Sequence, residues 1–265
     1  MLEAQEKQAG EDSKRLSAGE IFSAAMQTGR DELNRSTRAL GFSGFTGGIT
    51  MGLTGLAVAC IEATVGSTGW SELAGYILYP IGFISVVIGR GQLFTENTLY
   101  PVILVLDERN PRHVRNLARL WLVVFVANVA GALSFAALAI ASGALKQEIA
   151  TALVALGNAA LNQPDSRLFF GGIIGGWLIA LVAWVVTASH WTIGQVIMVW
   201  LLTFVVGIGH FAHCIATSGE ILAAVIARTA SVGAYLHWLL LATLGNIVGG
   251  VIIVSLLNYG QVKET

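Results

Sequence analysis

Charged side chains are scarce in this sequence. Asp, Glu, Lys and Arg make up 12% of the 265 residues, whereas hydrophobic residues make up 55%. A soluble domain has roughly a quarter of its residues charged, so this composition is typical of a chain that has lipid as its solvent. The formal net charge of -1 comes without a dense basic tract, and we therefore expect no nucleic acid as a partner.

Cysteine is also rare, and several motifs are missing. Cys60 and Cys214 both lie in apolar stretches, which argues against a disulfide framework and a Cys-rich metal site. The sequence has no Gly-Lys-Ser/Thr nucleotide motif, no nucleophile motif and no carboxylate cluster typical of an enzyme, so we expect neither ATP-driven transport, nor catalysis, nor a cofactor. The first 39 residues lack an apolar core beside the first methionine, and we expect no cleavable signal peptide.

Long apolar runs, by contrast, dominate the chain. Six runs reach the roughly 20 residues that a spanning helix needs. They cover residues 41–64, 73–89 continuing to 106, 117–142, 169–188, 193–209 continuing to about 227, and 233–258. Polar residues interrupt the second and the fifth run. We therefore predict an all-α integral membrane protein with six transmembrane helices, of which the second and fifth are broken.

The lysines and arginines predict the orientation. Eleven fall on the side of the N-terminus and three on the other side. Cytoplasmic loops carry the positive excess, so we expect a multi-pass protein of the cell inner (plasma) membrane with both termini in the cytoplasm. We divide the chain into a cytoplasmic amphipathic segment at 1–39, a transmembrane channel domain at 40–258 and a cytoplasmic tail at 259–265. Segment 1–39 is expected to lie against the membrane surface, with a solvated tail as the alternative.

The two halves of the apolar region resemble each other. FTGGITMG from Phe45 matches FFGGIIGG from Phe169 at an offset of 124, and ANVAGAL matches GNIVGGV at an offset of 118. GQLFTE matches GHFAHC at 118 as well, which aligns Thr95 with His213. Each half has three spans, and an odd number inverts the second half relative to the first. We predict inverted repeats at about 40–142 and 165–258, with the solute path where the matched interruptions meet.

Polar side chains inside the interrupted spans carry the functional hypotheses, because ionisable groups at membrane depth are costly unless they face protein or water. The candidates for the pore are Arg90, Gln92, Thr95, Asn97, His210 and His213. The candidates for an ion pair or a relay are Glu62, Glu96 and Glu220. An alternative of equal weight pairs Arg90 with one of these glutamates in a structural ion pair.

The sequence suggests specific roles for two histidines and four tryptophans. His210 and His213 would share a helical face if the helix continued through both, but nothing beyond Cys214 supports a zinc site, and we predict no metal. Histidine has an ordinary pKa of about 6.5, which suits it to offering a proton or a hydrogen bond to a small weak acid. The tryptophans expected as anchors at the membrane interface are Trp70, Trp177, Trp191 and Trp238.

The motifs GQLFTEN and HCIAT resemble the second-span loop and the fifth span of the formate/nitrite transporter family. The resemblance extends over residues 40–258 and includes the Asn-x-x-Gly pattern of the third and sixth spans. It implies an aquaporin-like protomer with broken second and fifth helices, assembled as a homopentamer with one pore per protomer. The family passes monovalent anions of weak acids such as formate, nitrite and hydrosulfide.

The same resemblance implies roles for individual residues. His213 would be the central histidine and Thr95 its partner in the loop. The residues implied to form the apolar constrictions are Leu93, Phe94 and Phe83 on the inner side and Tyr79 and Val206 on the outer side. The chain departs from the family pattern at Gly176, where asparagine is usual, and in having no lysine between Lys146 and Gly176. These departures, with the additional Arg90 and His210, indicate a divergent subgroup.

We therefore predict a channel or transporter for small monovalent weak-acid anions, such as formate or nitrite, in which His213 assists protonation at the apolar constrictions. The glutamates and the missing lysine motivate an alternative, a channel for a neutral or cationic solute such as ammonia, a polyol or a weak base. A third hypothesis is a structural membrane protein with a closed pore. The expected partners are the small solute, the lipid bilayer and further copies of the chain.

Overall fold

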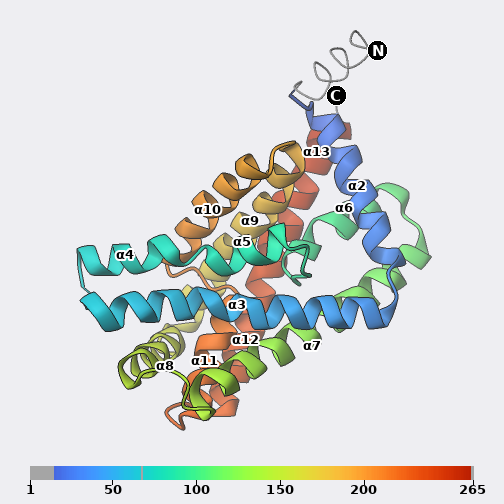
Figure 1. The fold of residues 1–265 in the computed structure, drawn as a ribbon. Helices are drawn as coiled ribbons and strands as arrows, with labels where there is room; N and C mark the ends of the chain where they lie inside the picture. Colours follow the sequence, from blue (N-terminus) through green and yellow to red (C-terminus); the bar gives the residue numbers. More distant parts are fainter. Residues whose placement is uncertain (1–14, 67, 264–265) are drawn as a thin grey trace, which may run out of the picture.

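The computed structural model describes residues 15–66 and 68–263, and over these ranges it contains helices and no strand. The α-helices, drawn in Figure 1, are α2 (Ala18–Asn34), α3 (Thr37–Val65), α4 (Trp70–Leu78), α5 (Ile81–Ile88), α6 (Tyr100–Glu108), α7 (Pro111–Ala136), α8 (Gln147–Leu161), α9 (Asp165–Ala188), α10 (Thr192–Ile208), α11 (Ala216–Ile226), α12 (Val232–Ile247) and α13 (Leu257–Lys263). The short 3₁₀ helix η1 (Glu96–Thr98) precedes α6, and the π-helical turns η2 (Ala137–Ala141) and η3 (Val248–Leu256) follow α7 and α12.

Long apolar helices make up most of the fold. Within the described residues, five helical stretches are long and apolar enough to cross a membrane: Thr37–Val65, Trp70–Ile88, Pro111–Ala141, Asp165–Ala188 and Val232–Lys263. They coincide with five of the six apolar runs of the sequence. The remaining run is divided between α10 and the shorter α11, which are separated by residues 209–215. Likewise, residues 89–99 separate α5 from α6. The chain is a multi-pass helical membrane protein.

Glycines allow close contact between helices of the membrane region. A Cβ atom on Gly48 of α3 would lie 2.0 Å from the carbonyl oxygen of Asn128 in α7, and one on Gly176 of α9 would lie 2.3 Å from that of Asn246 in α12. In lipid, helix association depends on such close van der Waals packing rather than on a hydrophobic driving force. The positions of α3 against α7 and of α9 against α12 are thus fixed by small residues.

Helix α2 packs on the protein. Its start is a capping box, in which the Ser17 hydroxyl accepts from the Glu20 N–H at 3.3 Å and the Glu20 carboxylate accepts from the Ser17 N–H at 2.7 Å. Its buried residues are Phe22, Ala25, Gly29 and Leu33. The amphipathic pattern expected here is present, and this apolar face contacts α6. Residues 1–14 of the expected segment lie outside the described residues.

The first and last described helices lie at the same end of the molecule. Figure 1 shows α2 next to α13, and the two helices are in contact. Arg30 of α2 forms an ion pair with Glu108, while Lys263 of α13 forms one with Asp107 at 2.6 Å. Since both acids end α6, this helix joins the two terminal elements. Helix α13 continues to Lys263.

Candidate functional site

Two buried asparagines hold the non-helical segments that interrupt the membrane region. Asn128 accepts from the Phe94 N–H at 2.9 Å and donates to the carbonyls of Gly44 and Gln92 at 2.7 and 2.8 Å. Its counterpart in α12 makes the same three bonds. Asn246 accepts from the Cys214 N–H at 2.9 Å and donates to the carbonyls of Gly172 and Ala212, both at 2.8 Å. Unpaired backbone groups are very costly at membrane depth, so these amides stabilise both segments.

The matching bonds correct the alignment expected between the segments. Phe94 corresponds to Cys214, so the offset is 120 (214 − 94) and not the expected 118. Leu93 is therefore the counterpart of His213, and Thr95 is not. The first helices correspond at an offset of 128 (172 − 44), given by the partners Gly44 and Gly172, and not at the expected 124. Only the offset of 118 between the two asparagines agrees with the expected alignment.

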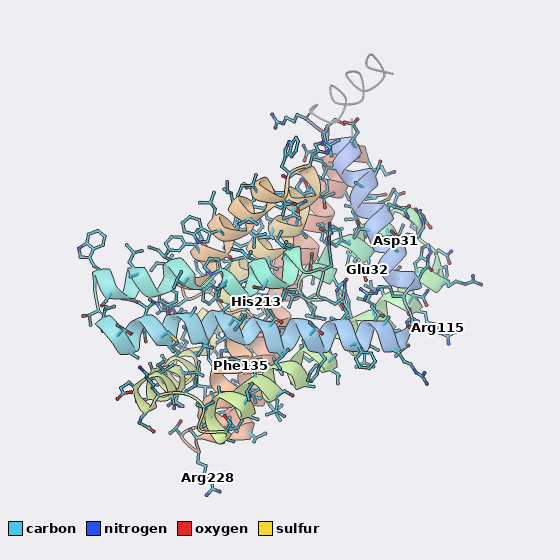
Figure 2. The ribbon with its side chains drawn as sticks, viewed as in Figure 1. Asp31, Glu32, Arg115, Phe135, His213 and Arg228 are labelled. Carbon is cyan, nitrogen blue, oxygen red and sulfur yellow. The ribbon has the colours of Figure 1, made fainter. Side chains whose placement is uncertain are left out.

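Thr95 and His213 nevertheless meet in the interior. The Thr95 Oγ1 lies 2.8 Å from the His213 Nε2, and both side chains are fully buried. The His213 Nδ1 accepts from the Ala216 N–H at 3.0 Å, so in a neutral ring the proton is on Nε2, which donates to the threonine hydroxyl. The His213 and Phe83 rings form a T-shaped pair, with centroids 5.1 Å apart. Figure 2 shows His213 in the middle of the bundle, with Glu32 and Arg228 toward opposite ends.

Two cavities open on either side of this pair. The larger, which we call the Glu220 vestibule, has a volume of about 290 Å³. The polar and aromatic side chains that line it include Glu62, Glu72, Tyr76, Tyr79, His210, Phe211, Thr217, Glu220 and Trp238. The smaller, which we call the Arg90 vestibule, has about 50 Å³. It is lined by Thr28, Glu32, Val87, Arg90, Gly91, Gln92, Glu96, Asn97, Tyr100 and Val186. Neither cavity reaches Thr95 or His213.

The helix formed by α4 and α5 shows that the buried pair lies between the vestibules. Tyr79, Phe83 and Val87 are spaced by four residues and therefore share one helical face. Tyr79 lines the Glu220 vestibule and Val87 lines the Arg90 vestibule, while Phe83 between them contacts His213. Phe83 and Leu93 are each 1% exposed. Buried apolar side chains therefore surround the Thr95–His213 pair between the two vestibules.

The residues expected at the constrictions occupy different surroundings. Tyr79 and Val206 are buried at the wall of the Glu220 vestibule. Phe94 is also buried, but its ring packs edge-on against Trp121 and Phe125 of α7, with centroids 5.5 and 5.0 Å away. Its ring therefore helps to fix the segment 89–95 on α7.

The sequence suggested a structural ion pair of Arg90 as an alternative, and the part of the chain that the structure describes contains no such pair. Among the described residues, no carboxylate lies within 4.0 Å of its guanidinium. Glu62 and Glu220 line the opposite vestibule, whereas Glu32 and Glu96 share the cavity of Arg90. The Arg90 side chain is exposed, and its backbone is left-handed with φ of +57°. Nearby, Asn97 donates to the Gln92 Oε1 at 2.8 Å, which orders the wall of this vestibule.

The two histidines of the fifth run are separated. Helix α10 ends at Ile208, so they do not share a helical face as they would in a continuous helix. His210, with φ of +50°, lies in the Glu220 vestibule, where its Nδ1 is 3.2 Å from the Tyr76 hydroxyl and its Nε2 is 3.4 Å from Glu72. The described part of the chain holds no group of three His, Cys, Asp or Glu residues suited to a metal ion.

Sequence reasoning missed part of the Glu220 vestibule. Glu72 and Tyr76 are polar groups one turn apart in the apolar helix α4, and this spacing is a signal that could have identified them. Helix α8, whose 15 residues are too few for a span, contributes a wall through Ala155 and its neighbours. Trp238, expected to anchor at the interface, is instead 3% exposed and lines the vestibule.

A closed polar centre between two vestibules, inside a bundle of membrane-crossing helices, is the architecture of a channel or transporter rather than of an enzyme. The family model described as formate/nitrite transporter matches residues 19–260. The chain belongs to the formate/nitrite transporter family.

Relatives and solved structures agree with this membership. The inner membrane protein YfdC of Escherichia coli is 32% identical, over 99% of this chain and 86% of that protein. A probable formate transporter of Methanothermobacter thermautotrophicus is 27% identical, over 83% and 88%. Two solved structures share the fold at 19% identity: an FNT family ion channel, with a TM-score of 0.79 over 94% of this chain and 98% of that one, and a pentameric formate channel with formate bound, with 0.71 over 86% and 98%.

Proposed function

We propose that this chain is a channel or transporter for small monovalent weak-acid anions such as formate or nitrite, and that its path runs between the two vestibules past Thr95 and His213. The observation that carries the proposal is this buried hydrogen-bonded pair, the polar centre of an otherwise apolar barrier. Relatives named as formate transporters or channels support the solute class. The proposed barrier residues are Phe83 and Leu93 on the inner side and Tyr79 and Val206 on the outer side, while Phe94 holds the inner segment on α7.

The apolar barrier favours a neutral species over an anion. A bare carboxylate loses its hydration in such surroundings at a cost far above that of the neutral acid. The His213 Nδ1 already accepts a backbone N–H, so the ring is best suited to offer its Nε2 hydrogen to the solute as a hydrogen bond. The proton that neutralises the anion then comes from water at a vestibule. His213 assists by stabilising the solute where it crosses.

The arrangement proposed around this path is that of two inverted three-helix halves. The identical hydrogen bonds of Asn128 and Asn246 support the pairing of the halves. The broken second helix would be α4–α5 with α6, and the broken fifth α10 with α11. We propose a membrane domain at 40–258, cytoplasmic segments at 1–39 and 259–265, insertion in the inner membrane and assembly as a homopentamer, which a pentameric structural relative supports.

Flux into vesicles tests the proposal. The purified chain is reconstituted, and uptake of labelled formate and nitrite is measured from pH 8 to pH 5. Uptake is expected to rise as the pH falls, because the fraction of neutral acid increases. Protein-free vesicles provide the background of acid that crosses the lipid alone. If no monovalent weak acid enters above this background at any pH, the proposal fails.

One observation favours a second candidate, a channel for a neutral or cationic solute. Among the described residues, three carboxylates and no lysine or arginine line the Glu220 vestibule. An anion approaching this mouth meets like charge, whereas a cation or an uncharged base does not. Planar-bilayer recordings with ion replacement separate the two candidates, because a current that follows the cation gradient would support the second.

A further inference from the structure

We propose that the Glu220 vestibule is a binding site for small ammonium-type cations such as methylammonium. Glu62 reaches the cavity from α3, Glu72 from α4 and Glu220 from α11, so three separate helices converge on it. Within residues 15–66 and 68–263, no lysine or arginine lines the cavity, and His210 is its one histidine. This inference does not depend on which solute crosses the barrier.

Glu220 is the residue that points to a ligand. Its side chain lines the vestibule, yet the residue is only 8% exposed. Throughout residues 15–66 and 68–263 its carboxylate has no hydrogen-bond donor and no ion-pair partner. Its Cγ is held 2.5 Å from the position of a Cβ on Gly55, so the packing of α3 leaves it little freedom to turn outward. Its oxygens face the vestibule without a donor from the described protein, and a bound cation with N–H donors would supply one.

Aromatic rings complete the site and favour an ammonium over a metal ion. Tyr76, Tyr79, Phe211 and Trp238 all line the cavity. Organic cations are attracted to the faces of such rings, Trp above all. Calcium, in contrast, takes six to eight oxygen ligands, and the described residues hold no cluster that could provide them. The cavity of about 290 Å³ has room for a small organic cation with several waters, since one water occupies about 30 Å³ of the liquid.

Glu72, the third acid of the vestibule, is already in contact with His210, which in turn contacts Tyr76. Glu72 already approaches the His210 Nε2 at 3.4 Å, and the Tyr76 hydroxyl approaches the Nδ1 at 3.2 Å. These contacts occupy Glu72 and leave Glu62 and Glu220 to face the cation. Glu220 is therefore expected to be the strongest of the three acceptors.

Equilibrium binding tests the site directly. Full-length protein in detergent micelles is titrated with ¹⁴C-methylammonium in a scintillation-proximity assay. Saturable binding is expected, and Glu220→Gln should weaken it at least about tenfold, because a charge-assisted hydrogen bond contributes about that much. Glu62→Gln should act in the same direction, and it keeps the test valid if Glu220→Gln fails to fold.

A matched control is Glu148→Gln, which makes the same change of charge at an exposed residue in the first turn of α8, outside the cavity. It should leave the affinity within about twofold. The inference is overturned if wild-type protein shows no saturable binding, if calcium displaces the label and unlabelled ammonium does not, or if Glu220→Gln and Glu62→Gln both bind as wild type. Formate uptake by vesicles is scored separately, so failure of the weak-acid proposal leaves a positive binding result intact, and the reverse also holds.

Discussion

The segments 89–95 and 209–215 are held in the same way and carry different chemistry. Each is fixed by one asparagine through three hydrogen bonds. At the position where the second segment has His213, however, the first has Leu93, and where the first has Thr95, the second has Ile215. The comparison teaches that the backbone support is duplicated while the polar centre is built once, from one side chain of each segment.

The largest effect is expected from removing a support. Asn128→Leu and Asn246→Leu each delete three hydrogen bonds in the membrane interior, and at about 1 kcal/mol each the loss is about 3 kcal/mol of unfolding free energy. Thermal unfolding in detergent, followed by tryptophan fluorescence, should show a strong and similar decrease for both. Asn34→Leu, at an exposed position of α2, is the control. A decrease in only one of the two variants would break the equivalence of the supports.

The next effect concerns the chemistry of the second segment. His213→Leu gives it the side chain of its counterpart Leu93, and the barrier then lacks its hydrogen-bond donor. Formate uptake should fall at least about tenfold, the usual worth of a hydrogen bond to a charged or polarised group. His190→Leu makes the same change at an exposed residue and should leave uptake unaltered. Undiminished uptake with His213→Leu would remove this residue from the proposed path.

The smallest effect is expected from the first segment. Thr95→Val keeps the shape of the side chain and deletes the hydroxyl that accepts from His213. Because the imidazole can still reach the solute, uptake should fall only about threefold, equivalent to a weak neutral hydrogen bond. Thr46→Val, at an exposed position of α3, is the control. A loss as large as that of His213→Leu would mean that the two side chains act as one unit.

The fold was largely predictable because apolar length and small residues dictate it. The apolar runs identified the spans, and the Asn-x-x-Gly pattern identified the two supporting asparagines. The alignment of the halves was wrong where glycines recur. FFGGIIGG contains two Gly-Gly pairs one helical turn apart, and Gly47–Gly48 can be aligned with either. The loop is ambiguous in the same way, because Gly89 and Gly91 are both available to match Gly209.

The site was predictable only in part, for a reason of geometry. Polar residues inside apolar runs are visible in a sequence, and so Thr95 and His213 were identified. The walls of the vestibules come from helices far apart in the chain, and no local pattern indicates that α8, Glu72 and Trp238 share one cavity. In the same way, the amphipathic face of α2 does not reveal whether lipid or α6 covers it.

Arg90 and His210 have a left-handed backbone, and each lines one of the two vestibules. Each vestibule therefore contains a residue whose backbone conformation is unfavourable for any side chain larger than that of glycine. A residue with a Cβ costs roughly 1–2 kcal/mol in this conformation, and glycine would cost far less. Glycine at either position would therefore give a more stable protein whose vestibule lacks that side chain. Selection for thermal stability alone would favour such variants. The more stable protein would then lack a side chain that could contact a solute entering the vestibule.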